Sequence, residues 1–211
     1  MSAIPVVHAV TDDLVLGRGD FLDRARAVMR ALGARGALHL RGRLHPAARL
    51  YELALSLLSS QERTGCWVVV SDRVDLARAA RARGVQLTSR SLRVADARRI
   101  APDLAVGASV HAAPEACVAA EEGADWVVAG HVYATPSHAG MPGRGVALVR
   151  SVVAASRAPC IAIGGVRPEH VGALIAAGAH GVAVIRGIWS ASDAERAAID
   201  YLSEYDTHRG G

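Results

Sequence analysis

The stretch PCIAIGGVRPEHVGALIAAGAHGVAVIRG, residues 159–187, carries the pattern that decides the fold. It holds a short apolar run ending in a glycine pair, a helical segment that opens at Pro168 and stops at Gly178, and a second short apolar run. Proline near the start and glycine just past the end are typical of helix boundaries. Short, continuously apolar runs are typical of strands covered on both faces. The stretch therefore predicts a strand, a helix and a second strand in succession.

The same alternation recurs along the chain. The predicted strands are the short apolar runs at 6–10, 37–41, 67–71, 84–88, 105–111, 126–131, 159–165 and 181–187. Helical patterns lie between many of them, at 20–32, 46–60, 74–83, 114–122, 168–177 and from 193 onward. About eight strand-then-helix units are the count of a (β/α)8 barrel.

The predicted fold class is therefore α/β, and the predicted architecture is a single (β/α)8 TIM barrel. A doubly wound open sheet is the alternative, but no G-x-G-x-x-G follows the first strand. Because no linker or low-complexity segment divides the chain, we expect one domain over residues 1–211. The tail at 205–211, YDTHRGG, is expected to be frayed.

Composition and charge exclude several classes of function. The 211 residues are 51% hydrophobic and 21% charged, which indicates a folded chain with a large core. Only 4% are aromatic, and no dense basic run is interleaved with them, so no nucleic-acid partner is expected. No apolar run is long enough to cross a bilayer and no leader pattern opens the sequence, so no membrane partner is expected and the predicted location is cytoplasmic. The net charge of +4 suits an anionic small molecule.

The cysteines predict neither a disulfide framework nor a metal site. Cys66, Cys117 and Cys160 are odd in number and form no C-x-x-C. Cys66 and Cys160 stand at the start of apolar runs and are interpreted as core thiols. No metal and no cofactor is expected.

Polar side chains gather where the predicted strands end, which is where barrels of this kind place their active sites. The candidates are Thr11, Asp12, Asp13, Arg41, Arg43, Ser71, Asp72, Arg73, Gln86, Thr88, Ser109, His111, His131, Thr135, Ser137, His138, Gly164, Gly165, Arg186 and Gly187. A barrel with a purely structural role would not need polar groups concentrated at one end of its apolar runs.

The glycines after the last two strands indicate a phosphate site. Gly164 and Gly165 end the seventh strand, and Arg186 and Gly187 end the eighth. Loops after these two strands commonly hold phosphate in such barrels, because glycine lets the backbone amides approach an anion. The alternative is that Gly164 and Gly165 only turn a tight corner.

His131 is the predicted catalytic residue. It follows Gly130 at the end of the sixth strand, and an imidazole can take up and return a proton near neutral pH. A buried rim histidine without a catalytic role is the alternative. Arg41 and Arg43 are predicted to share a face and bind a carboxylate, or else to form rim salt bridges with Asp12, Asp13 or Asp72.

Several motifs together resemble the thiamine phosphate synthase superfamily, and most of all its thiazole tautomerase (TenI-like) branch. They are SDRVDLA (71–77), GVQL (84–87), GASVH (107–111), ADWVVAGHVYATPSHAG (124–140), AIGG (162–165) and GVAVIRGIW (181–189). The resemblance runs from about Ala9 to Trp189, and it implies a (β/α)8 barrel.

The sequence departs from the synthase branch at three places. That branch carries Q-L-R-x-K where this chain has HLRGR (39–43), and it binds magnesium with two aspartates. Asp72 matches the first aspartate, but QLTSRSL (86–92) supplies no second acid. His131 and His138 replace residues of the synthase loop, and G-H-V is typical of the tautomerase branch.

The resemblance therefore implies an isomerase, a cofactor-independent thiazole tautomerase that converts a carboxylated dihydrothiazole phosphate to the aromatic carboxythiazole phosphate. His131 would shuttle the proton, while Gly164, Gly165, Gly187 and Arg186 would hold the phosphate. Arg41, Arg43, Asp72, Ser109 and Thr135 would complete the binding site for this phosphorylated thiazole partner.

Two other functions remain open from the sequence. One is thiamine phosphate synthase, a magnesium-dependent transferase, and the other is a non-catalytic barrel that binds thiazole phosphate or regulates. The oligomeric state is also open, because apolar Ile188 and Trp189 admit either a homo-oligomer contact or packing against the last helix.

Overall fold

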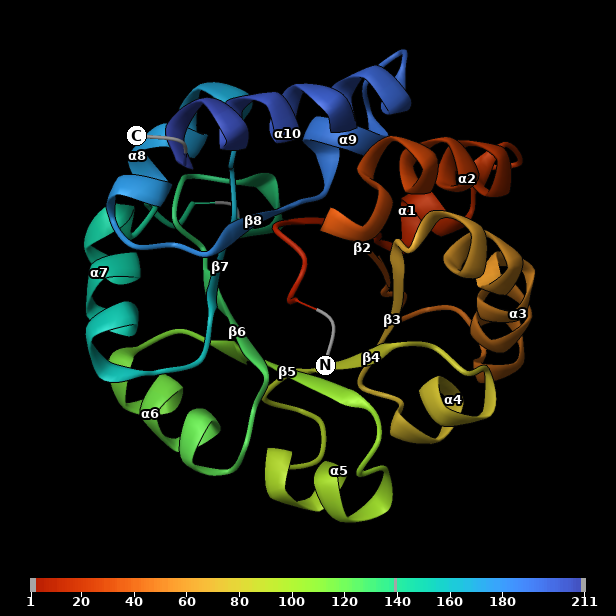
Figure 1. The fold of residues 1–211 in the computed structure, drawn as a ribbon, viewed down its shortest axis with the longest axis horizontal. Helices are drawn as coiled ribbons and strands as arrows, with labels where there is room; N and C mark the ends of the chain where they lie inside the picture. The colour runs from red at the N-terminus through yellow and green to blue at the C-terminus, as the bar shows by residue number, and fades with distance from the viewer. Residues whose placement is uncertain (1–2, 139, 210–211) are drawn as a thin grey trace.

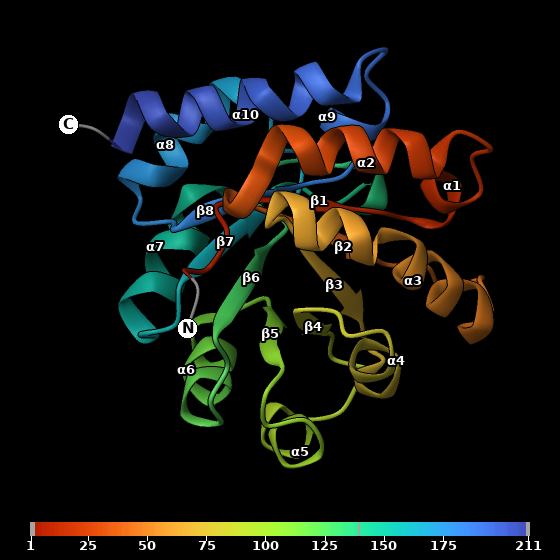
Figure 2. The ribbon, with the colours of Figure 1, turned by 45° about the vertical axis from the view of Figure 1, so that its right-hand side comes forward.

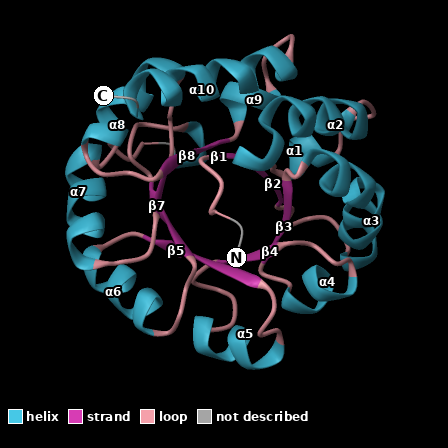
Figure 3. Ribbon diagram, viewed as in Figure 1, coloured by secondary structure: helices cyan, strands magenta, loops and turns pink. Residues whose placement is uncertain are grey.

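A closed ring of parallel strands forms the centre of the molecule, with helices around its outside (Figures 1 and 3). The computed structural model of the chain describes residues 3–138 and 140–209. Its strands are β1 (Val7–Val10), β2 (Gly36–Leu40), β3 (Trp67–Ser71), β4 (Gly84–Leu87), β5 (Ala105–Val110), β6 (Trp126–Gly130), β7 (Cys160–Ile163) and β8 (Gly181–Val184). Each pairs in parallel with the next, and β8 pairs with β1. This confirms the predicted (β/α)8 barrel and excludes the open sheet.

Helices follow every strand. The α-helices are α1 (Asp13–Leu16), α2 (Phe21–Leu32), α3 (Ala47–Thr64), α4 (Val74–Ala79), α5 (Val94–Ile100), α6 (Ala113–Glu121), α7 (Gly145–Ala155), α8 (Val171–Ala176), α9 (Arg186–Trp189) and α10 (Ala194–Arg209). Short 3-10 turns are η1 (Gly33–Arg35), η2 (Pro136–His138) and η3 (Pro168–His170). The sequence did not predict α5 or α7, because neither begins at a side-chain cap or a proline. None of the helices in the described ranges is long and apolar enough to cross a membrane.

The barrel interior is filled by indole rings that fit against glycines. Trp126 is fully buried, and its ring meets that of Trp67 edge-on with centroids 6.3 Å apart. A Cβ on Gly84 would lie 3.0 Å from the Trp126 ring, and a Cβ on Gly107 would overlap it. Strands β4 and β5 therefore need glycine at these two positions to accommodate the Trp126 ring. The ring fills the barrel interior at the amino-terminal end of β6.

One prediction about the C-terminal region is wrong, and one alternative that the sequence left open is decided. Helix α10 continues to Arg209 and buries Tyr205, so residues 205–209 are not frayed; residues 210 and 211 lie outside the described residues. Ile188 and Trp189 are buried within the chain rather than exposed to a partner. The Trp189 Nε1–H donates to the Val10 carbonyl at 2.9 Å, which ties α9 to β1.

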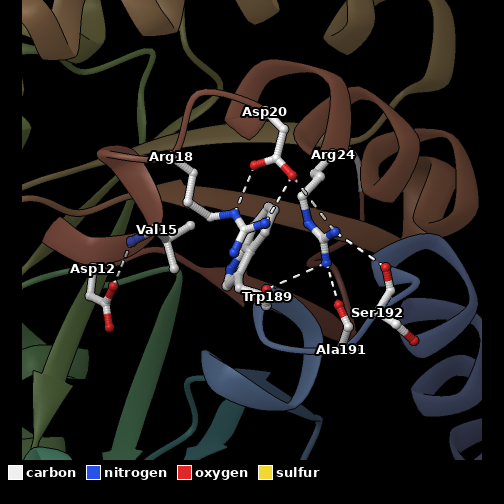
Figure 4. Close-up of polar contacts among 8 residues, drawn as sticks. All are labelled: Asp12, Val15, Arg18, Asp20, Arg24, Trp189, Ala191 and Ser192. Carbon is white, nitrogen blue, oxygen red and sulfur yellow. Dashed lines mark hydrogen bonds and ion pairs between the residues drawn. The ribbon is translucent and has the colours of Figure 1, made fainter.

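Helices α2 and α10 lie side by side over the junction of the first and last strands (Figure 2). Close to this contact, Arg24 of α2 donates to the carbonyls of Trp189, Ala191 and Ser192 (Figure 4). Asp20 holds the Arg24 guanidinium from the other side at 3.9 Å. This clamp fixes the segment after β8, which also carries Arg186 and Gly187.

Candidate functional site

A cavity of about 270 Å³ opens at the carboxyl ends of the strands, and residues from all eight strands or the loops after them line it. That volume lies just below the usual range for small-molecule sites, and an adjoining pocket of about 340 Å³ extends it. The predicted residues that line it are Arg41, Arg43, Ser109, His131, Thr135, Gly164, Gly165, Arg186 and Gly187. Asp72 lines an adjoining pocket that shares Arg41, Arg43 and Ser71 with the first. The structure thus brings the predicted residues to one end of the barrel, while their roles stay predictions.

His131 lies in the wall of the cavity at the end of β6, with only 6% of its surface exposed. Its Nε2 lies 3.1 Å from the Pro142 carbonyl, and its own carbonyl accepts from the Arg144 amide at 3.2 Å. Because a carbonyl only accepts, the neutral ring carries its proton on Nε2. His131 therefore anchors the loop that runs from β6 to α7. The side chain of His138, in the same loop, lies outside the described part.

The glycine pair after β7 allows this loop to pack against the barrel. Gly164 has φ +104° and Gly165 has φ +64°, a region that favours glycine. A Cβ on Gly164 would lie 2.5 Å from the His131 Cβ, and a Cβ on Gly165 would lie 2.5 Å from the Ala134 carbonyl. Packing alone accounts for both glycines, so their identity is not by itself a sign of phosphate binding.

Backbone donors nevertheless face the cavity from β7 and β8. Within the described ranges, the amide N–H groups of Gly165, Arg186 and Gly187 have no acceptor. The Arg186 guanidinium donates to the Thr135 hydroxyl at 2.7 Å and so stays at this side of the cavity. Amides and a guanidinium that converge in this way can bind a phosphate group. We refer to this part of the site as the amide end.

Two buried, hydrogen-bonded histidines, His8 and His39, lie at the floor of the cavity, and the sequence analysis predicted no role for them. His8 Nδ1 lies 2.8 Å from His39 Nε2, and His8 Nε2 lies 3.0 Å from the Pro5 carbonyl. Burial is the main cause that lowers the pKa of His8 to about 4, and it lowers the pKa of His39 well below its usual value. Both rings are therefore neutral at pH 7. His8 must donate to Pro5 from Nε2, so His39 donates to His8 and keeps a lone pair on Nδ1.

A second hydrogen-bonded chain supports the floor from β4 to β6. The Trp126 Nε1–H donates to the Gln86 amide oxygen at 2.8 Å, and the Gln86 amide nitrogen donates to the Ser109 hydroxyl at 3.1 Å. Gln86 and Ser109 both line the cavity. The buried indole thus fixes the orientation of two polar groups that a ligand would meet.

Arginines dominate the side of the cavity formed by β2, β3 and β4. Arg41, Arg43 and Arg90 all line it, and none of the three forms an ion pair with a residue in the described part of the chain. Burial lowers the pKa of Arg41, and the nearby charge of Arg43 lowers it further. The sequence did not single out Arg90, although it lies directly after the fourth strand. We refer to this group as the arginine end.

Arg41 and Arg43 form no direct ion pair with Asp12, Asp13 or Asp72, whose carboxylates accept other hydrogen bonds in the described part of the chain. Asp12 accepts from the Val15 amide at 3.0 Å and so caps α1. Asp13 accepts from the amides of Arg43 and Leu44, both at 2.8 Å. The backbone of the loop after β2, rather than a guanidinium, satisfies Asp13.

Asp72 is committed to the loop after β4. Its Oδ1 accepts both the amide and the hydroxyl of Thr88 at 2.8 Å, and its carbonyl accepts from the Ser91 hydroxyl at 3.1 Å. Neither pocket contains another acid, and the described residues hold no group of three or more potential metal ligands. Magnesium prefers several oxygen ligands including carboxylates. The donor set therefore does not fit the two-aspartate magnesium site that the synthase branch implies.

Sequence comparison identifies the family. Residues 7–188 match the family described as Thiamine monophosphate synthase. The chain belongs to this family. The thiamine-phosphate synthase of Methanoculleus marisnigri is 39% identical, and the match covers 91% of each chain. The bifunctional protein ThiM/ThiE of Symbiobacterium thermophilum is 44% identical over 75% of this chain, but this chain spans only 34% of that protein. A solved structure of the thiamine phosphate pyrophosphorylase from Pyrococcus furiosus superposes with a TM-score of 0.85 at 29% identity, covering 97% of both chains.

These comparisons correct the predicted activity within the family. Relatives 35–41% identical to this chain are named thiamine-phosphate synthase, which denotes a transferase. The prediction of a thiazole tautomerase, and with it of an isomerase, is therefore wrong. The G-H-V motif at Gly130 that favoured it is a local feature, whereas the match to the synthase extends over nearly the whole chain.

Proposed function

We propose that this chain is a thiamine-phosphate synthase, a transferase that joins a phosphorylated thiazole to a second substrate and releases pyrophosphate. The observation that carries the proposal is the 39% identity to a thiamine-phosphate synthase over 91% of both chains. The 0.85 TM-score to a thiamine phosphate pyrophosphorylase supports it. The cavity adds chemical support, because it presents two separate groups of anion-binding donors.

The amide end suits the phosphate of the thiazole. Amides of Gly165, Arg186 and Gly187 have unused donors there, and the Arg24 clamp fixes the segment that carries two of them. Donors fixed before the ligand arrives bind an anion without a further loss of conformational freedom. The thiazole ring would then lie against the loop that His131 anchors.

The floor suits the second substrate. His39 Nδ1 offers an acceptor, and Gln86 and Ser109 have their orientation fixed by Trp126. Polar groups placed in this way select a ring by its pattern of donors and acceptors. The displaced pyrophosphate would leave toward the arginine end, where guanidinium groups can stabilise the charge that develops on it.

The direct test is product formation. The purified protein is incubated with the thiazole phosphate and the pyrimidine pyrophosphate, with and without magnesium, and thiamine phosphate is measured by fluorescence after oxidation to a thiochrome. We expect thiamine phosphate and pyrophosphate in equal amounts. Ligand binding without any product under both conditions would overturn the transferase and favour the non-catalytic barrel.

A further inference from the structure

The arginine end holds an unsatisfied buried hydroxyl among unpaired positive charges. Ser71 ends β3 with 8% of its surface exposed, and its Oγ has no hydrogen-bond partner among the described residues. It lines both pockets together with Arg41, Arg43 and Arg90. A buried hydroxyl without a partner is unfavourable, so it points to a ligand that supplies the missing hydrogen bond.

At the arginine end, no carboxylate of the described residues forms a direct ion pair with Arg41, Arg43 or Arg90, although Asp72, Asp12 and Asp13 act on Arg41 at longer range. Arg73, at the edge of this end, is paired with Asp75. Asp12 caps α1, Asp13 accepts from the Arg43 and Leu44 amides, and Asp72, the acid that lines the second pocket in the described part of the chain, is occupied by two hydrogen bonds from Thr88. Those bonds hold the β4–α5 loop in place, and this loop carries Arg90. The site is therefore arranged for an anion with several negative oxygens.

We infer that this end binds a diphosphate group without a divalent cation, with the guanidinium groups of Arg41, Arg43 and Arg90 and the hydroxyl of Ser71 taking the place of the metal. The inference rests on the proposed function, which supplies pyrophosphate as the leaving group. Guanidinium forks bind phosphate oxygens bidentately and keep their charge at every physiological pH. Arg41 and Arg43 match the arginine and lysine of the synthase element, and Arg90 adds a third positive charge beside them.

The position of the site separates it from the amide end. Its residues follow β2, β3 and β4, whereas the amide end follows β7 and β8, and β3 lies opposite β7 in the ring of eight strands. An extended ligand, or two anionic ligands, can thus occupy both ends at once. This predicts that substitutions at one end affect only the anion bound there.

Calorimetric titration with sodium pyrophosphate tests the inference on the whole chain. We expect the dissociation constant in excess EDTA to agree within about 2-fold with that in magnesium chloride after correction for magnesium pyrophosphate formation. Arg43→Gln and Arg90→Gln should each weaken binding on the order of 10-fold, since each removes a charged hydrogen bond. Ser71→Ala should weaken it by a smaller factor.

Two control variants make the result specific. Arg196→Gln removes a surface charge that is paired with Asp200 on α10, and it should leave the dissociation constant unchanged. Arg186→Gln removes a guanidinium from the amide end and should change it by less than about 2-fold. Circular dichroism confirms that each variant is folded, which is expected because Arg43 and Arg90 are exposed.

Three outcomes would overturn the inference: binding that disappears in EDTA, unchanged binding by Arg43→Gln and Arg90→Gln, or equal weakening by Arg186→Gln. The result is separable from the proposed function. If pyrophosphate binds without metal but no thiamine phosphate is formed, the inferred binding site is supported and the proposed synthase function is overturned. If both product formation and pyrophosphate binding require magnesium, the proposed synthase function is supported and the inference of metal-independent binding is overturned.

Discussion

Acidification should destabilise the protein through the buried His8–His39 pair. The pKa of His8 is about 4 in the folded chain, against 6.5 for an ordinary histidine, with burial the main cause. The unfolded chain therefore binds more protons than the folded chain between pH 6.5 and 4, so stability falls as the pH falls through this window. At pH 5 the unfolded ring is almost fully protonated while the folded ring is about one-tenth protonated, which corresponds to a loss of about 2 kcal/mol relative to pH 7.5. His39 adds to the loss in the same direction.

Urea unfolding at pH 7.5, 6 and 5, followed by tryptophan fluorescence, measures this effect. His8→Gln removes the titrating ring, so its loss of stability between pH 7.5 and 5 should be about 2 kcal/mol smaller than that of the parent. His208→Gln, a change of an exposed histidine on α10, is the matched control and should behave as the parent does. Equal acid losses in the parent and His8→Gln would refute the reasoning. If His8→Gln fails to fold, nitrogen NMR of the histidine rings in the parent tests the same point. At pH 5 the His8 ring should still be neutral, with its proton on Nε2.

Three further changes test how the site is built. Gly164→Ala places a Cβ 2.5 Å from the His131 Cβ at φ +104°, and it should lower the free energy of unfolding by about 2–4 kcal/mol; a loss below about 0.5 kcal/mol in urea unfolding would contradict the packing role. His131→Ala removes the bond to Pro142, and it should lower kcat/KM roughly 2- to 13-fold, while His131→Gln should recover part of the loss if the ring only anchors the loop. Arg24→Ala leaves several carbonyls without their donor, and it should lower the unfolding free energy by about 1.5–3 kcal/mol and weaken binding of inorganic phosphate; unchanged melting would show that the clamp is dispensable.

The architecture could be predicted because its signals are local. Strand and helix boundaries such as Pro168 and Gly178 are set by neighbouring residues, so the repeated pattern was visible along the chain. Helix α7 begins at Gly145 without a capping side chain, and α5 has only seven residues, so neither left a clear boundary. The position of the cavity followed from the barrel rule alone.

The details of the site depend on contacts between strands, which the sequence does not display. His8 and His39 meet only because β1 and β2 pair with His8 opposite Ala37 and Val10 opposite His39. The glycine pair looked like a phosphate motif, yet its requirement comes from the packing of a loop that begins about thirty residues earlier. The prediction of the family branch was wrong for a related reason. The G-H-V motif at Gly130 is local, whereas the similarity to a synthase extends along nearly the whole chain.

The closure of the ring by β1 and β8 has a consequence for how the protein is made. β1 leaves the ribosome well before its partner strand Gly181–Val184, because the rest of the barrel lies between them in the chain. Until then every nascent chain is an open sheet with two unpaired edges, a form that readily associates with other chains. Nascent fragments that end before Gly181 are therefore expected to need chaperones more than the closed barrel does.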